Sequence, residues 1–116
     1  MNAISLTEKL ALVDTFWDPR IITQYNGNDV MVVKVKGEFV WHSHPDTDDF
    51  FFVVKGRIRI ELEHETVRLE AGQLFVVPRG VEHRPVADEE AHLLLIEPAG
   101  TPNTGSPETA SAKPYI

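Results

Sequence analysis

Short apolar segments, each bounded by glycine, proline or a polar turn, follow one another from about residue 20 to residue 97. Some alternate apolar and polar side chains, so that one face is buried and the other meets water. In residues 57–63, Ile58, Ile60 and Leu62 alternate with charged residues in this way. Segments this short and closely spaced are typical of a β-sandwich or a β-barrel. The sequence therefore predicts an all-β protein.

The two ends of the chain differ from this strand region. Ser5 and Glu8 form a capping-box pattern, and apolar residues recur at helical spacing behind them. Pro19 would end such a helix, because the residue before a proline avoids the helical region. After the strands, proline, threonine, serine, glycine and alanine predict an irregular, partly mobile tail. We expect a single domain over residues 1–116, with a helix at about 5–17, a barrel at about 20–97 and a tail at 98–116.

Two groups of residues in the strand region carry metal-binding side chains. His42 and His44 are two positions apart, so in a β-strand both side chains lie on the same face. Asp49 follows them, and His83 stands on a distant segment. Imidazole and carboxylate ligands suit Zn, Fe, Ni, Mn or Cu, and too few are present to fill an octahedron. We predict one divalent transition metal ion at this site, with a position left open for water or a substrate.

The spacing of these residues resembles the motifs of the cupin superfamily. The family's second motif fits from Gly72 through Pro78 and Gly80 to His83 without a gap. The match extends through the flanking strands to nearly the whole chain and looks like that of small single-domain bacterial cupins. Such proteins are sometimes loosely described as similar to mannose-6-phosphate isomerase. The resemblance implies a double-stranded β-helix, the cupin jelly-roll barrel, and says little about the reaction.

The first motif fits less closely than the second. Gly37 lies one residue too close to His42, and Asp49 replaces the usual Glu. At the end of the second motif, Ala87 stands where the family often has Asn. The Asp49 side chain is shorter than Glu by roughly 1.5 Å, about one C–C bond. Asp49 therefore either lies on a strand closer to the metal or acts through a water molecule. The alternative is that the protein is a metal-free cupin, which has kept these four residues by descent without binding a metal through them.

Alternation along the segment after Asp49 predicts the walls of the metal cavity. Phe51 and Val53 share a face with Asp49 and are expected to line a mostly apolar, aromatic-walled cup. Phe50 and Phe52 face the other way, towards a second layer or a partner subunit. Apart from the ligands, no acid or base is expected beside the metal.

Two classes of function fit such a site. One is a metalloenzyme that oxygenates or isomerises a small molecule, in which the metal polarises the substrate. The other is a ligand-binding sensor or carrier without turnover. A sugar-phosphate isomerase fits less well, because no cluster of Arg and Lys is evident to hold a phosphate. His64 and His92 are expected to lie outside the site.

Charge and composition narrow the partners to small molecules. The net charge of −7 at pH 7, with no basic cluster, argues against a nucleic-acid partner. No segment approaches the roughly 20 apolar residues that span a bilayer. The first residues lack the basic flank and apolar run of a signal peptide. A cytoplasmic protein is expected.

A homodimer is also expected. The outward face of Phe50, Phe52 and Val54, together with the amphipathic helix, supplies more apolar surface than one small barrel can bury. Two-fold pairing is the commonest way to cover such a face. The alternative is that the helix folds back over its own barrel.

Overall fold

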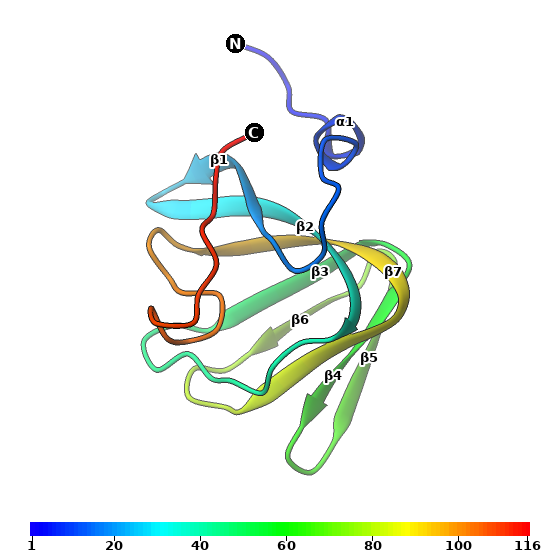
Figure 1. The fold of residues 1–116 in the computed structure, drawn as a ribbon, viewed down its shortest axis with the longest axis vertical. Helices are drawn as coiled ribbons and strands as arrows, with labels where there is room; N and C mark the ends of the chain where they lie inside the picture. Colours follow the sequence, from blue (N-terminus) through cyan, green and yellow to red (C-terminus); the bar gives the residue numbers. More distant parts are fainter.

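The computed structural model describes residues 1–116, and its regular secondary structure is almost entirely β-strand (Figure 1). The single helix is too short to span a membrane. The strands form one antiparallel seven-stranded sheet that curls into a barrel, as the sequence predicts. The elements are α1 Leu6–Leu10, β1 Arg20–Tyr25, β2 Asn28–Glu38, β3 Asp49–Lys55, β4 Arg57–Leu62, β5 Thr66–Glu70, β6 Leu74–Val77 and β7 His83–Pro98.

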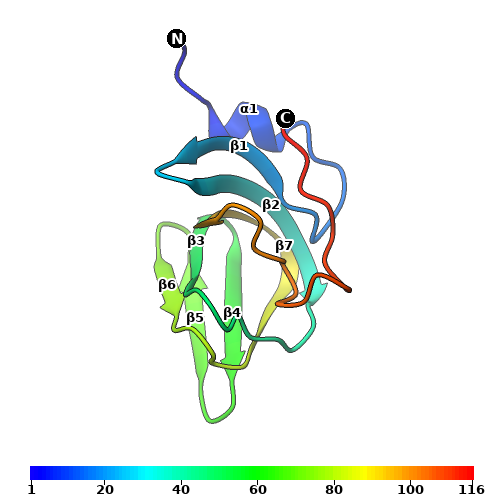
Figure 2. The same ribbon diagram turned by 90° about the vertical axis from the view of Figure 1, so that its left-hand side faces the viewer.

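The long strand β7 holds the sheet together. It pairs with β2 along most of its length, with β4 near its start and with β3 near its end, so the sheet bends around it (Figures 1 and 2). Residues 88–90, three consecutive acidic residues, lie inside this strand. The strand continues because Ala87 and Ala91 on either side pair with Gly37 and Val35 of β2.

The inner face of the barrel is packed with the apolar residues that alternation predicts. Met31, Val33 and Val35 of β2 are between 0% and 2% exposed. Ile58 and Ile60 of β4 are buried against the same core, while the residues between them face solvent or are half-buried. The alternating strands of the sequence are therefore the strands that close the barrel.

The N-terminal helix is shorter than expected, because it ends at Leu10 instead of continuing to residue 17. Ser5 caps it as predicted. Further on, Trp17 has a φ of 65° and its backbone N–H donates to the carbonyl of Lys34 at 2.8 Å. Its indole N–H donates to the carbonyl of Lys36 at 2.9 Å. The edge of β2 thus binds Trp17 in a bend with a left-handed backbone conformation, which no α-helix could provide.

The outer face of the sheet is only partly covered. Leu10 of α1 packs against Ile22 and Val32 at one end. At the other end, Leu74 and Val76 of β6 remain 55% and 40% exposed beside the half-buried outward side chains of β3. The helix therefore folds over its own barrel but leaves part of this apolar face open.

The C-terminal tail is irregular but does not leave the barrel. Figure 2 shows it, in orange and red, turning back along the barrel to end near α1 and β1. There Tyr115 forms an isolated parallel bridge with Ile21.

Candidate metal centre

The four predicted ligands come from three segments that meet at one end of the barrel. Asp49 begins β3 and His83 begins β7. His42 and His44 lie between β2 and β3, outside any regular strand, although their spacing is interpreted above as that of a β-strand. Only an isolated bridge forms there, in which the backbones of His42 and His83 exchange hydrogen bonds of 2.9 and 3.0 Å. Gly80 N–H also donates to the carbonyl of His44 at 2.8 Å. These contacts tie the two motifs together.

The ligand atoms of the four residues converge on one point. One atom from each lies within 4.8 Å of all the others. Oδ2 of Asp49 is 2.8 Å from Nε2 of His83, 3.3 Å from Nε2 of His44 and 3.9 Å from Nε2 of His42. All four residues are buried, with at most 8% exposed. The structure thus brings together the residues that the sequence analysis selected, and their role as ligands stays a prediction.

Backbone carbonyls fix how two of the imidazoles are oriented. Nδ1 of His42 is 2.8 Å from the carbonyl oxygen of Val40, and Nδ1 of His83 is 2.9 Å from that of Val81. A carbonyl oxygen only accepts, so each Nδ1 carries the proton and donates it. In the neutral ring Nε2 is then unprotonated, with its lone pair directed towards Asp49. This arrangement is common in metal-binding histidines.

These contacts make the centre fit a cation. Nε2 of neutral His83 and Oδ2 of Asp49 are both acceptors, yet they lie 2.8 Å apart. Such a contact needs either a second proton on the ring or a cation shared by the two atoms. In a tetrahedral site with bonds of about 2.0–2.1 Å, ligand atoms are separated by roughly 3.3 Å. The three separations from Asp49 bracket this value, so three nitrogens and one oxygen can surround a single divalent transition metal ion.

The ionisation states of the ligands also suit a metal. Burial is the main cause that lowers the pKa of His42 to about 4, and the hydrogen bond to the carbonyl of Val40 opposes it. Burial alone would raise the pKa of Asp49, but hydrogen bonds with His44 and His83 bring it down to about 2. Burial lowers the pKa of His44, but the hydrogen bond to Asp49 and the negative charges of Asp49 and Glu97 together outweigh burial and leave that pKa raised. At neutral pH His42 is therefore neutral and Asp49 is ionised.

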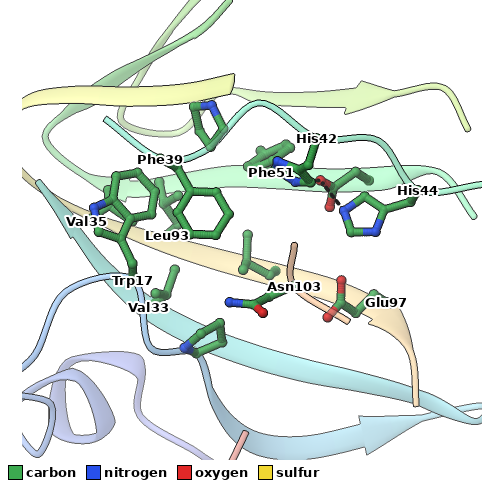
Figure 3. A pocket seen from close by; sticks show the side chains of 14 residues that line it. Trp17, Val33, Val35, Phe39, His42, His44, Phe51, Leu93, Glu97 and Asn103 are labelled. Carbon is green, nitrogen blue, oxygen red and sulfur yellow. Dashed lines mark ion pairs between the residues drawn. The ribbon is translucent and has the colours of Figure 1, made fainter. Parts of the chain in front are cut away.

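A mostly apolar cavity opens beside the centre (Figure 3). Phe51 lines it, as predicted, but Val53 is fully buried in the core instead. Trp17 and Phe39 form one wall as a stacked pair, with ring centroids 5.0 Å apart. The sequence analysis did not assign either of these aromatic residues to the site.

The cavity also holds polar groups that the sequence analysis missed. Glu97 and Asn103 line it, which overturns the expectation that no acid or base lies beside the metal. Burial raises the pKa of Glu97, opposed by the ammonium of Lys113. Glu97 follows Leu93 and Leu95 at alternate positions of β7, so extending the predicted strand by one residue would have placed it in the cavity. No local pattern in the sequence marks Asn103.

The other two histidines lie outside the site, as expected. The side chain of His64 is 87% exposed and pairs with Glu63. His92 pairs with Glu90 at 2.7 Å on the surface.

Known proteins share this fold and much of this sequence. A cupin-2 domain containing protein from Shewanella frigidimarina is 43% identical, with a TM-score of 0.81 over 82% of this chain and 93% of that chain. Protein NMB1881 from Neisseria meningitidis is 31% identical, with a TM-score of 0.77 over 84% of this chain and 100% of that chain. The uncharacterized protein YdbB of Bacillus subtilis is 36% identical over 64 residues, which make up 54% of this chain and 57% of YdbB. The aligned region thus spans little more than half of that curated relative.

A family description points the same way. The model of the cupin domain matches residues 29–97, the region that contains β2 to β7 and all four converging side chains. This chain belongs to the cupin family.

Proposed function

We propose that the protein binds one divalent transition metal ion through His42, His44, Asp49 and His83 and uses it to bind a small oxygen-bearing molecule. The observation that carries this proposal is the convergence of three Nε2 atoms and a carboxylate oxygen within 4.8 Å in a buried site. When bound, such a metal acts as a Lewis acid on a carbonyl or hydroxyl group.

The rest of the cavity determines what can bind beside the metal. The stacked rings of Trp17 and Phe39, with Phe51, exclude water and offer contacts to an apolar or planar molecule. Neither lysine nor arginine lines the cavity. A sugar phosphate is therefore a poor fit, because no cationic side chain is placed to bind the phosphate.

Turnover at this site is a second candidate, and Glu97 favours it. An enzyme that isomerises or oxygenates a small molecule benefits from an acid or base near the substrate, and Glu97 is a carboxylate in the same cavity that is not among the four converging residues. A sensor or carrier would not require such a group. The pairing of Glu97 with Lys113 means that the carboxylate must change partner before it can act on a substrate.

Elemental analysis of protein purified without chelating resin or added metal tests the proposal. We expect about one transition metal ion per chain. Iron would favour oxygenation, whereas zinc or nickel would favour Lewis-acid chemistry or binding alone. A protein that neither retains a metal nor takes one up from solution would be a metal-free cupin, and the proposal would be wrong.

A further inference from the structure

The end of the C-terminal tail is fixed to the barrel. The N–H of Ile21 in β1 donates to the carbonyl of Pro114 at 2.9 Å, and the N–H of Ile116 donates to the carbonyl of Ile21 at 3.1 Å. The ammonium of Lys9 in α1 binds the carbonyl of Ile116 at 2.7 Å. Residues 98–116 therefore form a strap, attached to β7 at one end and to β1 and α1 at the other.

A buried ion pair ties the last part of this strap back to its start. The ammonium of Lys113 donates to the carboxylate of Glu97 and to the carbonyl of Thr101. The two charged side chains are 10% and 7% exposed. Because removing one partner of such a pair leaves the other charge buried and unpaired, loss of the Lys113 side chain is expected to loosen the strap.

A glycine brings the strap against the metal centre. Gly105 has a φ of 78°, and a Cβ built there would lie 2.1 Å from the carbonyl oxygen of Ser43. Ser43 is the residue between His42 and His44. Only glycine lets the strap approach the backbone between these two residues so closely.

Asn103 of the strap presents a hydrogen-bond donor to the cavity. Its Oδ1 accepts the backbone N–H of Ser111 at 2.9 Å, which fixes the orientation of the amide. The structure records no acceptor for its Nδ2, and Figure 3 shows the amide in the cavity between Glu97 on one side and the Phe39 and Trp17 rings on the other. A free amide donor in the same cavity as the four converging side chains is suited to recognising an oxygen atom on a ligand.

We propose that the strap forms a wall of the ligand site and that Nδ2 of Asn103 donates to an oxygen atom of the bound molecule. The ligand is then a small, largely apolar molecule with at least two oxygen atoms, one for the metal and one for Asn103. This inference rests on the proposed function, because it takes the metal centre as the site of the first oxygen.

The strap is the least regular wall of the cavity. It has no regular secondary structure over residues 99–114, whereas most other lining residues belong to strands of the barrel.

A pair of glycine variants tests the strap itself without any metal. Gly105→Ala should force the strap away from Ser43. Gly100 has a similar φ, of 85°, but a Cβ built there meets nothing within 4 Å, so Gly100→Ala is the matched control. We expect amide hydrogen exchange at Ile21 and Ile116 to be about tenfold faster in Gly105→Ala than in Gly100→Ala. Lys113→Met, compared with the exposed Lys55→Met, should give the same contrast if Gly105→Ala fails to fold. Equal exchange within both pairs would show that these contacts do not hold a strap.

Asn103→Leu tests the proposed hydrogen bond. Cobalt(II)-loaded protein is titrated with benzoate, which offers two oxygens, and with imidazole, which binds metals without an oxygen, while the visible spectrum is recorded. We expect benzoate to bind about fivefold more weakly to Asn103→Leu than to wild type, the effect of one lost hydrogen bond, with imidazole unchanged. An unchanged benzoate affinity would overturn the role of Asn103. Failure to bind cobalt would instead be seen before any benzoate is added, and would overturn the proposed function with it.

Discussion

Replacing His44 with alanine is expected to remove the metal while the barrel stays folded. The imidazole of His44 lies 3.3 Å from the carboxylate of Asp49, so its loss removes one converging nitrogen. His44 does not belong to the 11-residue hydrophobic cluster that forms the core. Asp49 also keeps its 2.8 Å contact with His83. The variant should therefore lose a metal ligand at little cost to the fold.

The size of the effect follows from sharing the binding free energy among the ligands. Structural zinc sites with four ligands contribute about 10–16 kcal/mol of apparent binding free energy, so one ligand is worth roughly 2.5–4 kcal/mol. This corresponds to an affinity about 70- to 1000-fold weaker. In the metal-free protein the lost hydrogen bond to Asp49 should lower the free energy of unfolding by only about 1 kcal/mol.

Two measurements check this expectation. Competition with a chromophoric chelator gives the metal affinity, and thermal unfolding with and without zinc shows whether the metal still stabilises the fold. His64→Ala is the matched control, because that side chain is 87% exposed and has no proposed role in the site. If His44→Ala binds metal with wild-type affinity, the ligand assignment is wrong. If the variant is unfolded, the expectation that the barrel core does not depend on His44 is wrong.

Three further changes have defined outcomes. In the metal-free protein, His42 has a folded pKa of about 4, below the usual 6.5, so its stabilising contribution is complete above pH 6.5 and is lost as the pH falls towards 4. Urea unfolding should show wild type losing about 3 kcal/mol relative to His42→Gln across that range, and parallel curves would contradict the buried neutral state. Light scattering should give about twice 13.1 kDa for wild type and the monomer mass for Leu74→Glu, which places a charge on the exposed apolar face; a wild-type monomer would end the dimer hypothesis. Ile60→Ala, at a position with 0% exposure, should lower the free energy of unfolding by about 2–5 kcal/mol in chemical denaturation, and a smaller loss would mean that the core repacks around the gap.

The sequence was sufficient for the barrel and for the four converging side chains because both depend on local patterns. Alternation along β2 and β4 identifies the buried face of each strand. The spacing of His42, His44, Asp49 and His83 constrains where these side chains lie, because the glycines and prolines between them place the turns that connect the strands.

The features that the sequence could not supply depend on contacts between distant segments. The helix ends early because β2 binds Trp17 through two hydrogen bonds, and nothing near Trp17 in the sequence signals that partner. Asn103 reaches the cavity because Gly105 packs on Ser43 and Lys113 pairs with Glu97. Such contacts join segments whose proximity is decided only after the barrel has closed.

The central position of β7 has a consequence for the order of events in folding. Its pairing with β2 joins residues as far apart in the chain as Asn28 and Pro98, and it also carries His83. Chains dominated by such distant pairings fold slowly, because loop-closure entropy is lost before the contacts form. During synthesis His83 cannot reach His42 and Asp49 until β7 has left the ribosome and docked. We therefore expect metal ions to bind after the rate-limiting step, so that they slow unfolding and leave the folding rate unchanged.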